Sequence, residues 1–447
     1  MMKMGKLPVR LPSYGGGAAV VEIKDVKYSS PDAFALVLQS LPDADAINMA
    51  RMFIGIHDYF TEIFNSDNIT VGKVATILND PGIATSKVAE IFNNPKIAAS
   101  RIHSILSNVS ITANRVQAIL YQMADLGYVG KLNDIITTTA PDVSFTANTT
   151  VTGIVRYRNV SIASGVTLTV DGQPGVIIAY NLTNNGTITK TATGGAGGAP
   201  GGGVGRGGAG GGGLIIVANE VHYGTYNANG ANGENGTTTN VSTGGSAGGG
   251  GAMIRVGTNA PGNGGKGGSF APETEGRGGA PGAGGGGGAT QCGGAGGAVT
   301  LTTINSYSTI FAEVLKQAAD WYAVNVLGKT PTTTKSFYNV YGAGGGGGGD
   351  ADTYSDGGGG GGSGGQIIVS VNVINGGTFN ANGGKGGNGG TEGASDSGGG
   401  GGGGGIVYVL YKTLVASPTL NASGGAGGTG DYNGSAGTAG TALAIAV

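Results

Sequence analysis

The chain has 447 residues, of which 98 are glycine and 14 are proline, and its 24 basic and 26 acidic residues give a net charge of −2. Glycine at about three times its average frequency excludes an ordinary globular enzyme over most of the length. The balanced charge and the lack of a long basic run argue against nucleic acid as a partner. No apolar stretch approaches the ~18 residues of a membrane span, and no secretory leader is recognisable. We therefore expect neither a membrane-spanning helix nor a secretory leader.

Glycine is unevenly distributed along the chain. Only 14 of the glycines precede Gly194, which leaves 84 in the last 254 residues. This change in composition predicts an α+β protein with a helical first part and a mainly β, glycine-rich second part. The expected divisions are an N-terminal arm (1–30), a helical repeat module (31–129), a first group of strands (130–193) and a glycine-rich domain (194–447).

The helical part contains a repeat of 14 residues. Its units begin at Ile69, Ile83, Ile97 and Ile111. Within each unit, apolar residues recur at a spacing of three and four, which places them on one face of a short helix. Asn-Asp-Pro-Gly and Asn-Asn-Pro break the helix at the end of the first two units. Such short helices are marginal alone, so we expect a solenoid in which each helix packs on the next one.

Basic residues recur at one position of this repeat. They are Lys73, Lys87, Arg101 and Arg115. They would form either a solvated face or a ridge that docks to an acidic partner on a virion. His57 and His103 have no second ligand at metal spacing, and we expect both to be structural.

The second part repeats a β module. Two short runs rich in Val, Ile and Thr are followed by glycine, and the module returns from Gly175, Gly213, Gln366 and Ile406. The second run carries a signature, Thr225 to Gly230 and Thr378 to Gly383, with a variant from Thr419 to Gly424. A further copy from Ala298 runs through Ile310 and then gives way to an amphipathic segment. That segment predicts a helix inserted over 311–329, which either caps the glycine-rich core or contacts a neighbouring subunit.

The long glycine runs have no side chains to bury, and ordering them costs more backbone entropy than ordering any other residue. Order therefore requires extensive backbone hydrogen bonding. Closely packed polyglycine II helices meet this need, because hydrogen as the side chain lets backbones approach. We expect runs such as Gly344 to Gly349 to form such helices between layers of strands.

Motifs for chemistry are weak. Matches to nucleotide-binding glycine patterns occur by chance in such a sequence and lack the required strand and helix context. Asp350, Asp352 and Asp356 could hold Ca²⁺, but their spacing lacks the EF-hand pattern and we expect a solvated loop tip instead. We therefore predict no enzymatic activity, no cofactor and no metal.

Aromatic residues interrupt the glycine runs at Phe270, Tyr354 and Tyr432. An exposed aromatic side chain on a loop of a rigid scaffold commonly binds a saccharide or a protein surface, although local packing explains it equally simply. With the three aspartates above, these residues form the predicted receptor-binding set.

The alternation of glycine runs with short polar, aromatic loops resembles the receptor-binding adhesins at the tips of phage long tail fibres. The passage from Thr330 to Gly349 is similar to glycine-rich tailspike and attachment proteins of archaeal viruses. The resemblance covers roughly 143–447 and implies a sandwich of polyglycine II helices with variable loops at one end. The helical repeat is not part of the phage pattern.

We therefore predict a virion-surface attachment protein whose helical module docks to other virion proteins and whose loops bind a host glycan or protein receptor. A cell-surface or filament protein of an archaeon is the alternative, and an ice- or surface-binding protein with regularly spaced threonines is a third. Apolar faces at the ends of the helical stack and of the last strands, 442–447, predict a homo-oligomer, with a trimer favoured.

Overall fold

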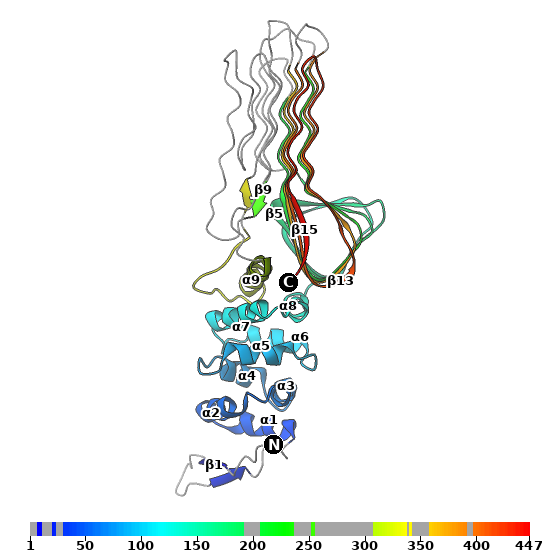
Figure 1. Ribbon diagram of the computed structural model, residues 1–447. Coiled ribbons are helices and arrows are strands. Elements are labelled where there is room, and N and C mark those ends of the chain that lie inside the picture. The colour runs from blue at the N-terminus through cyan, green and yellow to red at the C-terminus, as the bar shows by residue number, and fades with distance from the viewer. Residues whose placement is uncertain are drawn as a thin grey trace. The chain divides into compact units, whose positions relative to one another are not determined.

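The computed structural model describes residues 7–10, 20–23, 30–191, 206–236, 252–254, 307–337, 339–341, 357–390 and 397–447 (Figure 1). Contacts divide the chain into two units. The first unit comprises Met1–Met123 with Leu327–Thr332, and the second comprises Ala124–Val326 with Thr333–Val447. The combination of helices with a large, mainly parallel sheet is the α+β class that the sequence predicted.

The first unit is built from short helices that follow a two-stranded hairpin. The hairpin pairs β1 (Leu7–Arg10) with β2 (Val20–Ile23). The helices are α1 (Pro31–Ser40), α2 (Asp43–Phe53), α3 (His57–Asn65), α4 (Val71–Leu78), α5 (Thr85–Asn93), α6 (Ala99–Ser107) and α7 (Ala113–Asp125). The last four begin 14 residues apart, as the repeat predicted.

The apolar positions of the repeat are the core of this unit. The opening residues Ile69, Ile83, Ile97 and Ile111 are buried, and so are the helical positions that follow them. The packing partner differs from the prediction, because α3 packs on α1, α4 on α2, α5 on α3 and α6 on α4. Each short connection turns the chain away, so that the second helix along the sequence, not the next one, returns to cover the first.

A buried carboxylate ties two layers of this stack together. Arg51 of α2 donates two hydrogen bonds, of 2.6 and 2.5 Å, to Asp80 at the end of α4. Hydrogen bonding to Arg51 holds the pKa of Asp80 below its usual value. An acid with a lowered pKa in the folded state stabilises the fold above its unfolded pKa, about 3.9, and this contribution is lost as the pH falls through the folded pKa.

We expect Arg51→Met to lower the Tm by a few degrees at pH 7, and the gap to the parent to close as the pH falls through the lowered pKa of Asp80. Thermal unfolding monitored by circular dichroism across this pH range measures the gap. Lys96→Met is the matched control, because its pair with Glu62 is solvent-exposed and contributes little. An Arg51→Met gap that is constant from pH 7 to pH 2 would contradict this account.

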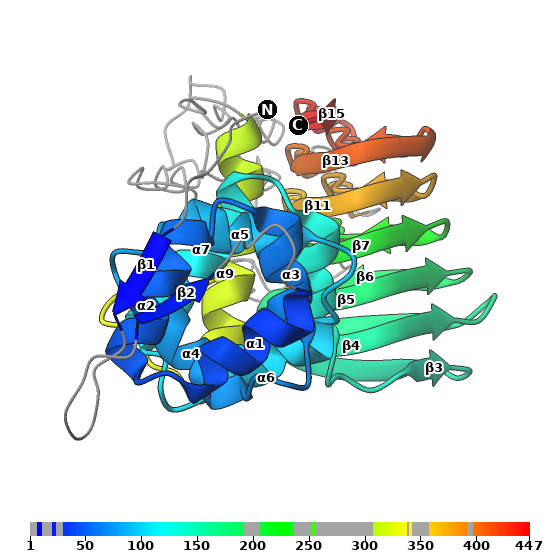
Figure 2. The same cartoon turned by 90° about the horizontal axis from the view of Figure 1, so that it is seen from below.

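The second unit begins with α8 (Val129–Thr137) and continues into a parallel solenoid. Its strands are β3 (Val143–Phe145), β4 (Thr149–Ile162), β5 (Thr167–Asn184), β6 (Thr187–Lys190), β7 (Gly213–His222), β8 (Thr225–Asn227), β11 (Gln366–Asn375), β12 (Thr378–Asn380), β13 (Ile406–Ala416), β14 (Thr419–Asn421) and β15 (Thr441–Ala446). Figure 2 shows β4, β5, β7, β11, β13 and β15 side by side along the sheet. A separate antiparallel pair joins β9 (Ala252–Ile254) to β10 (Asn339–Tyr341).

Each later coil of the solenoid has one long strand, a tight turn and one short strand. The long strands pair in the order β5, β7, β11, β13 and β15, and the short strands pair in the order β6, β8, β12 and β14, always in parallel. The predicted signature therefore aligns with itself, since Thr225 pairs with Thr378 and Thr378 with Thr419. The turn after β7 places Tyr223 and Gly224 at φ of 53° and 71°, a left-handed conformation that glycine favours.

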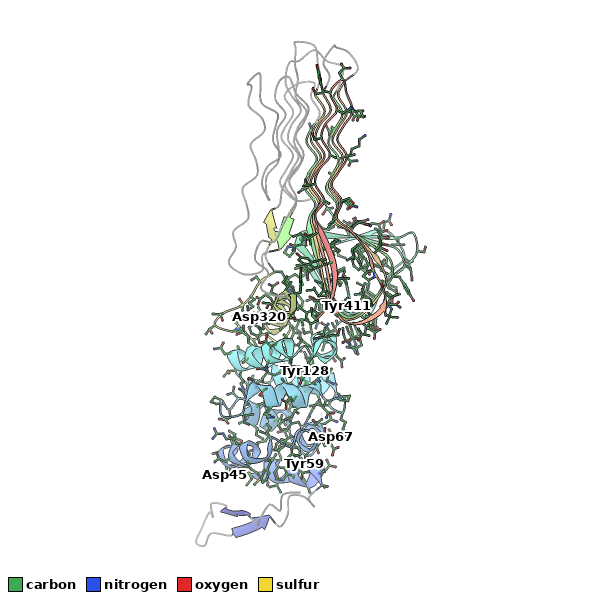
Figure 3. The ribbon with its side chains drawn as sticks, viewed as in Figure 1. Asp45, Tyr59, Asp67, Tyr128, Asp320 and Tyr411 are labelled. Carbon is green, nitrogen blue, oxygen red and sulfur yellow. The ribbon has the colours of Figure 1, made fainter. Side chains whose placement is uncertain are left out.

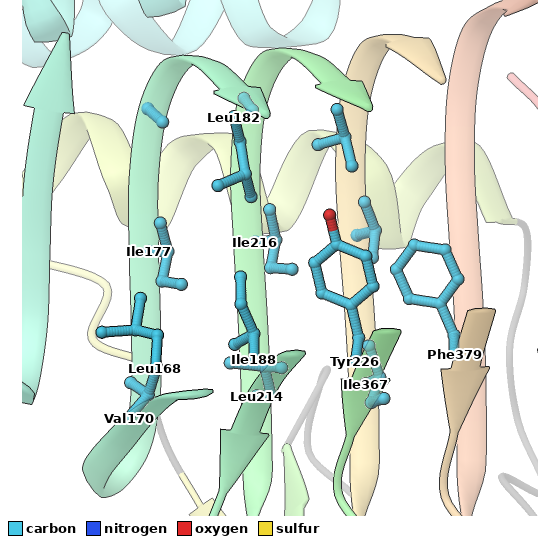
Figure 4. Close-up of a cluster of buried hydrophobic side chains, with 14 of the residues drawn as sticks. Leu168, Val170, Ile177, Leu182, Ile188, Leu214, Ile216, Tyr226, Ile367 and Phe379 are labelled. Atoms are coloured by element: carbon cyan, nitrogen blue, oxygen red, sulfur yellow. The ribbon is translucent and has the colours of Figure 1, made fainter. Parts of the chain in front are cut away.

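The interior of the solenoid is filled by side chains from both sets of strands (Figure 4). Isoleucine, leucine and valine of the long strands meet Ile188, Tyr226 and Phe379 of the short strands. Leu168 lies on the same side as these three, because the first part of β5 pairs with β6. The rings of Tyr226 and Phe379 stack with centroids 4.4 Å apart and planes 7° apart. Burial raises the pKa of the Tyr226 hydroxyl.

The outer face of the long strands is also covered, which explains why their sequences are continuous apolar runs. Helix α8 contacts β5, β7 and β11, and α9 (Tyr307–Asn325) contacts α8, β7 and β11. Helix α9 is the inserted helix that the sequence predicted, and Phe311, Val314 and Tyr322 of its stripe are buried. It begins earlier than predicted, so Thr309 and Ile310, expected in a further β module, are helical.

Candidate functional site: the glycine lattice and its loops

Between each short strand and the next long strand, the chain leaves the solenoid in extended, glycine-rich segments. We call these the glycine segments. The outgoing segments follow short strands and are 228–236, 381–389 and 422–430. The returning segments precede long strands and are 206–212, 357–365, 397–405 and 433–440.

Backbone hydrogen bonds join the glycine segments with a period of three residues. Along one returning segment, Gly358, Gly361 and Gly364 donate to carbonyl groups of the next returning segment at 2.8–2.9 Å. Gly359, Gly362 and Gly365, each one residue later, donate to the outgoing segment 228–236 at 2.7–2.9 Å. The segments thus form two hydrogen-bonded layers, which we call the glycine lattice.

The lattice leaves no space for a side chain at many of its glycine positions. A Cβ atom on Gly402 would lie 2.0 Å from the carbonyl oxygen of Gly362, and one on Gly384 would lie 1.9 Å from that of Ala231. Figure 3 shows that the glycine segments carry few side chains compared with the strands below them. Only glycine allows these backbones to approach so closely.

Side chains return at every third position of the outgoing segments, on the side away from the returning layer. These positions are Asn229, Asn232 and Asn235, then Asn382, Lys385 and Asn388, then Ser423, Ala426 and Thr429. The signature in the sequence contained Asn229, Asn382 and Ser423, but no role was predicted for this set. The spacing of Asn by three within 229–235 is a signal that could have revealed it.

Tyr432 is the one predicted receptor-binding residue within the described part of the chain. Its side chain is 49% exposed, in the loop between the segments 422–430 and 433–440. The backbone holds this loop, because the Tyr432 carbonyl accepts a hydrogen bond of 2.8 Å from the amide of Gly398. Asn433 accepts a bond of 3.3 Å from the amide of Gly430 on the other side of the loop. The aromatic ring is therefore displayed on an ordered backbone.

The other predicted receptor-binding residues are Phe270, Asp350, Asp352, Tyr354 and Asp356. They lie outside the described residues, as do the run from Gly344 to Gly349 and the start of the module at Ala298. Among the residues that the structure does describe, no three His, Cys, Asp or Glu side chains gather closely enough to hold a metal ion.

The four basic residues of the helical repeat do not lie on one row, because alternate helices belong to different columns of the stack. Three of them are turned inward. Lys73 donates to the carbonyl of Leu41 and to Asp43, and its side chain is only 9% exposed. Lys87 is 42% exposed and pairs with Glu90 at 3.4 Å.

The two arginines satisfy carbonyl groups at helix ends. Arg101 donates to the carbonyls of Phe64, Ser66 and Ile69, after α3. Arg115 donates to those of Leu78 and Ile83, after α4. Burial lowers the pKa of Arg115. These contacts give both side chains a structural role at helix C-termini, where a cation is favourable. Docking to a virion stays a prediction for this set.

A segment from far along the chain continues the same pattern. Lys329 donates to the carbonyls of Asn108 and Ile111, after α6, at 2.7 Å each. Thr332 then donates its amide and hydroxyl to Asn114. This repeats the contact that Thr112 makes with Asn79. Residues 327–332 therefore complete the helical stack of the first unit.

Comparison of the chain with protein-family models, with curated proteins and with solved structures gave no match in any of the three. Within the described ranges, no helix has the length and apolar character that crossing a bilayer would require.

Proposed function

We propose that the protein is a non-enzymatic attachment protein of a virion, which displays loops for recognition of a host glycan or protein. The observation that carries the proposal is the glycine lattice with an exposed aromatic side chain held at one of its loops. The glycine positions inside the lattice have no side chains that could distinguish one ligand from another. The inward side chains of the strands are buried in the core. Specificity therefore belongs to the loops and to the outward positions of the segments.

We also propose that the glycine segments are polyglycine II helices. Such helices have three residues per turn and no internal hydrogen bonds, so every N–H group must find a partner on a neighbouring helix. The three-residue period of the bonds between segments supports this assignment. The close approach of Gly402 to Gly362 supports it further.

The proposal predicts that Tyr432→Ala weakens binding to the receptor and leaves the Tm nearly unchanged, because an exposed side chain at a loop contributes little to stability. An aromatic contact of this kind is worth about 2 kcal/mol when it is central to an interface, or about thirtyfold in affinity. Binding of the purified protein to a glycan array and to intact cells measures the effect.

Tyr223→Ala is the matched control, since Tyr223 is 52% exposed in the turn between β7 and β8, away from the glycine segments. Equal binding by the parent and Tyr432→Ala, with a loss in Tyr223→Ala, would move the receptor site away from the lattice.

Immunogold labelling separates the virion from the alternative of a cell-surface filament, because only a virion protein would be found on purified particles.

A homo-oligomer, with a trimer favoured, belongs to the same proposal. Exposed apolar side chains occur on the first helices, at Leu36 and Met52, and separately on β13, at Leu414 and Val415. Contact between subunits would remove such surface from water. Light scattering at micromolar concentration tests this point, and a single-chain mass would contradict it.

A further inference from the structure

The outward asparagines of the glycine lattice share one contact. Asn229 accepts a hydrogen bond of 2.8 Å on Oδ1 from the amide of Asn382. The next residue, Gly230, donates its own amide to the carbonyl of the same Asn382 at 2.9 Å. One Asn-Gly pair thus holds both main-chain polar groups of a single residue in the neighbouring segment.

The same geometry recurs with the same spacing. Asn232-Gly233 holds Lys385, and Asn235-Gly236 holds Asn388. The residues held in this way then repeat the contact toward the next segment, where Asn382-Gly383 holds Ser423 and Asn388-Gly389 holds Thr429. All ten of these bonds are 2.8–3.1 Å long.

We infer that these five Asn-Gly pairs are main-chain clamps that join neighbouring outgoing glycine segments. Glycine offers only its N–H and C=O groups for such contacts. An amide side chain at every third position adds an acceptor that glycine lacks. It satisfies the N–H group of the residue that is held, which has no carbonyl acceptor among the described segments.

Two features of the chain concern the extent of this ladder of asparagine contacts. At the first, Lys385 stands where the ladder would have a further asparagine. Gly386 still donates to the carbonyl of Ala426 at 2.9 Å, but a lysine has no acceptor for the amide of Ala426. In the segment 422–430, the equivalent positions are Ser423, Ala426 and Thr429, so the asparagine ladder stops there.

The clamps also have a chemical consequence. In a free Asn-Gly sequence the glycine nitrogen attacks Cγ of asparagine, a C–N bond forms, and the side-chain nitrogen leaves as ammonia with the proton of the attacking amide. Water then opens the succinimide to aspartate or isoaspartate. In each clamp the glycine N–H is donated and Oδ1 is occupied, so the reaction requires the lattice to open first.

Asn232→Ala tests the inference, because it removes the acceptor of the Lys385 amide and leaves the bond from Gly233 in place. We expect a Tm lower by about 2–4 °C and faster hydrogen exchange at the Lys385 amide. Asn232→Asp keeps the acceptor and is expected to keep the protection. Ser423→Ala, at the end of the ladder, is the matched control and is expected to change neither.

The opposite substitution, Lys385→Asn, should complete the ladder. It is expected to slow exchange of the Ala426 amide and to raise the Tm. In the parent protein, peptide mass mapping should show deamidation of the five pairs at least about tenfold slower in the folded than in the urea-unfolded chain. Parent-like exchange in Asn232→Ala and in Lys385→Asn, or equal deamidation in the folded and unfolded chains, would overturn the inference.

Discussion

Replacing Gly402 with alanine is expected to lower the free energy of unfolding by about 3 kcal/mol or more, well above the ~1 kcal/mol of a typical substitution. The added Cβ would lie 2.0 Å from the carbonyl oxygen of Gly362 and 2.5 Å from its carbon, in a backbone held on both sides. Neither backbone can move without breaking hydrogen bonds of its layer. Urea unfolding of the variant against the parent gives the difference.

Ala426→Val is the control for added bulk in the same lattice. Ala426 is exposed at an outward position, so we expect a change within about 0.5 kcal/mol. If Gly402→Ala unfolds at the same urea concentration as Ala426→Val, the close packing of the segments is wrong.

Phe379→Ala is expected to cost about 3–5 kcal/mol, the range for removing a fully buried phenylalanine from a core. Phe379 is completely buried inside the solenoid, and its loss also removes the partner on which Tyr226 stacks. The same unfolding experiment measures the effect. Leu420→Ala is the matched control, because Leu420 occupies the same position of the next coil but is only partly buried.

We expect the control to lose less than half as much stability as Phe379→Ala, since a partly exposed site has less apolar surface to lose. Equal losses at the two positions would mean that the interior of the solenoid is not the main core of the second unit.

The sequence predicted those elements whose side chains follow a period. The units from Ile69 to Ile111 predicted the last four helices of the first unit, because apolar burial imposes a spacing that can be read directly. The recurring threonine and asparagine signature gave the short strands, and Thr225, Thr378 and Thr419 do align in register. In both cases the repeated residue occupies the same environment in every copy, so its spacing in the sequence predicts the structural repeat.

The packing of the helices and strands against one another was harder to predict from the sequence. The sequence placed each helix on the next one, whereas the structure places it on the second one along, and no single residue marks that choice. The basic positions suggested a surface, yet Arg101 and Arg115 bind carbonyl groups at helix ends. A positive charge that fits solvent also fits a helix C-terminus, and composition cannot separate the two.

The glycine segments show why the candidate site was only partly predictable. Glycine has no side chain, so which backbone lies beside which depends on hydrogen bonds between residues 41 or 153 positions apart. The exposed aromatic at Tyr432 was predictable, because it interrupts a uniform background. The outward asparagines were missed because each one alone resembles an ordinary turn residue.

Hydrogen exchange of the segment 381–389, followed by mass spectrometry on the intact protein, tests the central claim most directly. In the lattice, Gly383 and Gly386 donate to one neighbouring segment and Gly384 and Gly387 to another. The account predicts that these amides exchange as slowly as those of the adjoining strand β12, although five of the nine residues of the segment are glycine. Exchange at the rate of an unstructured glycine-rich peptide would contradict the account.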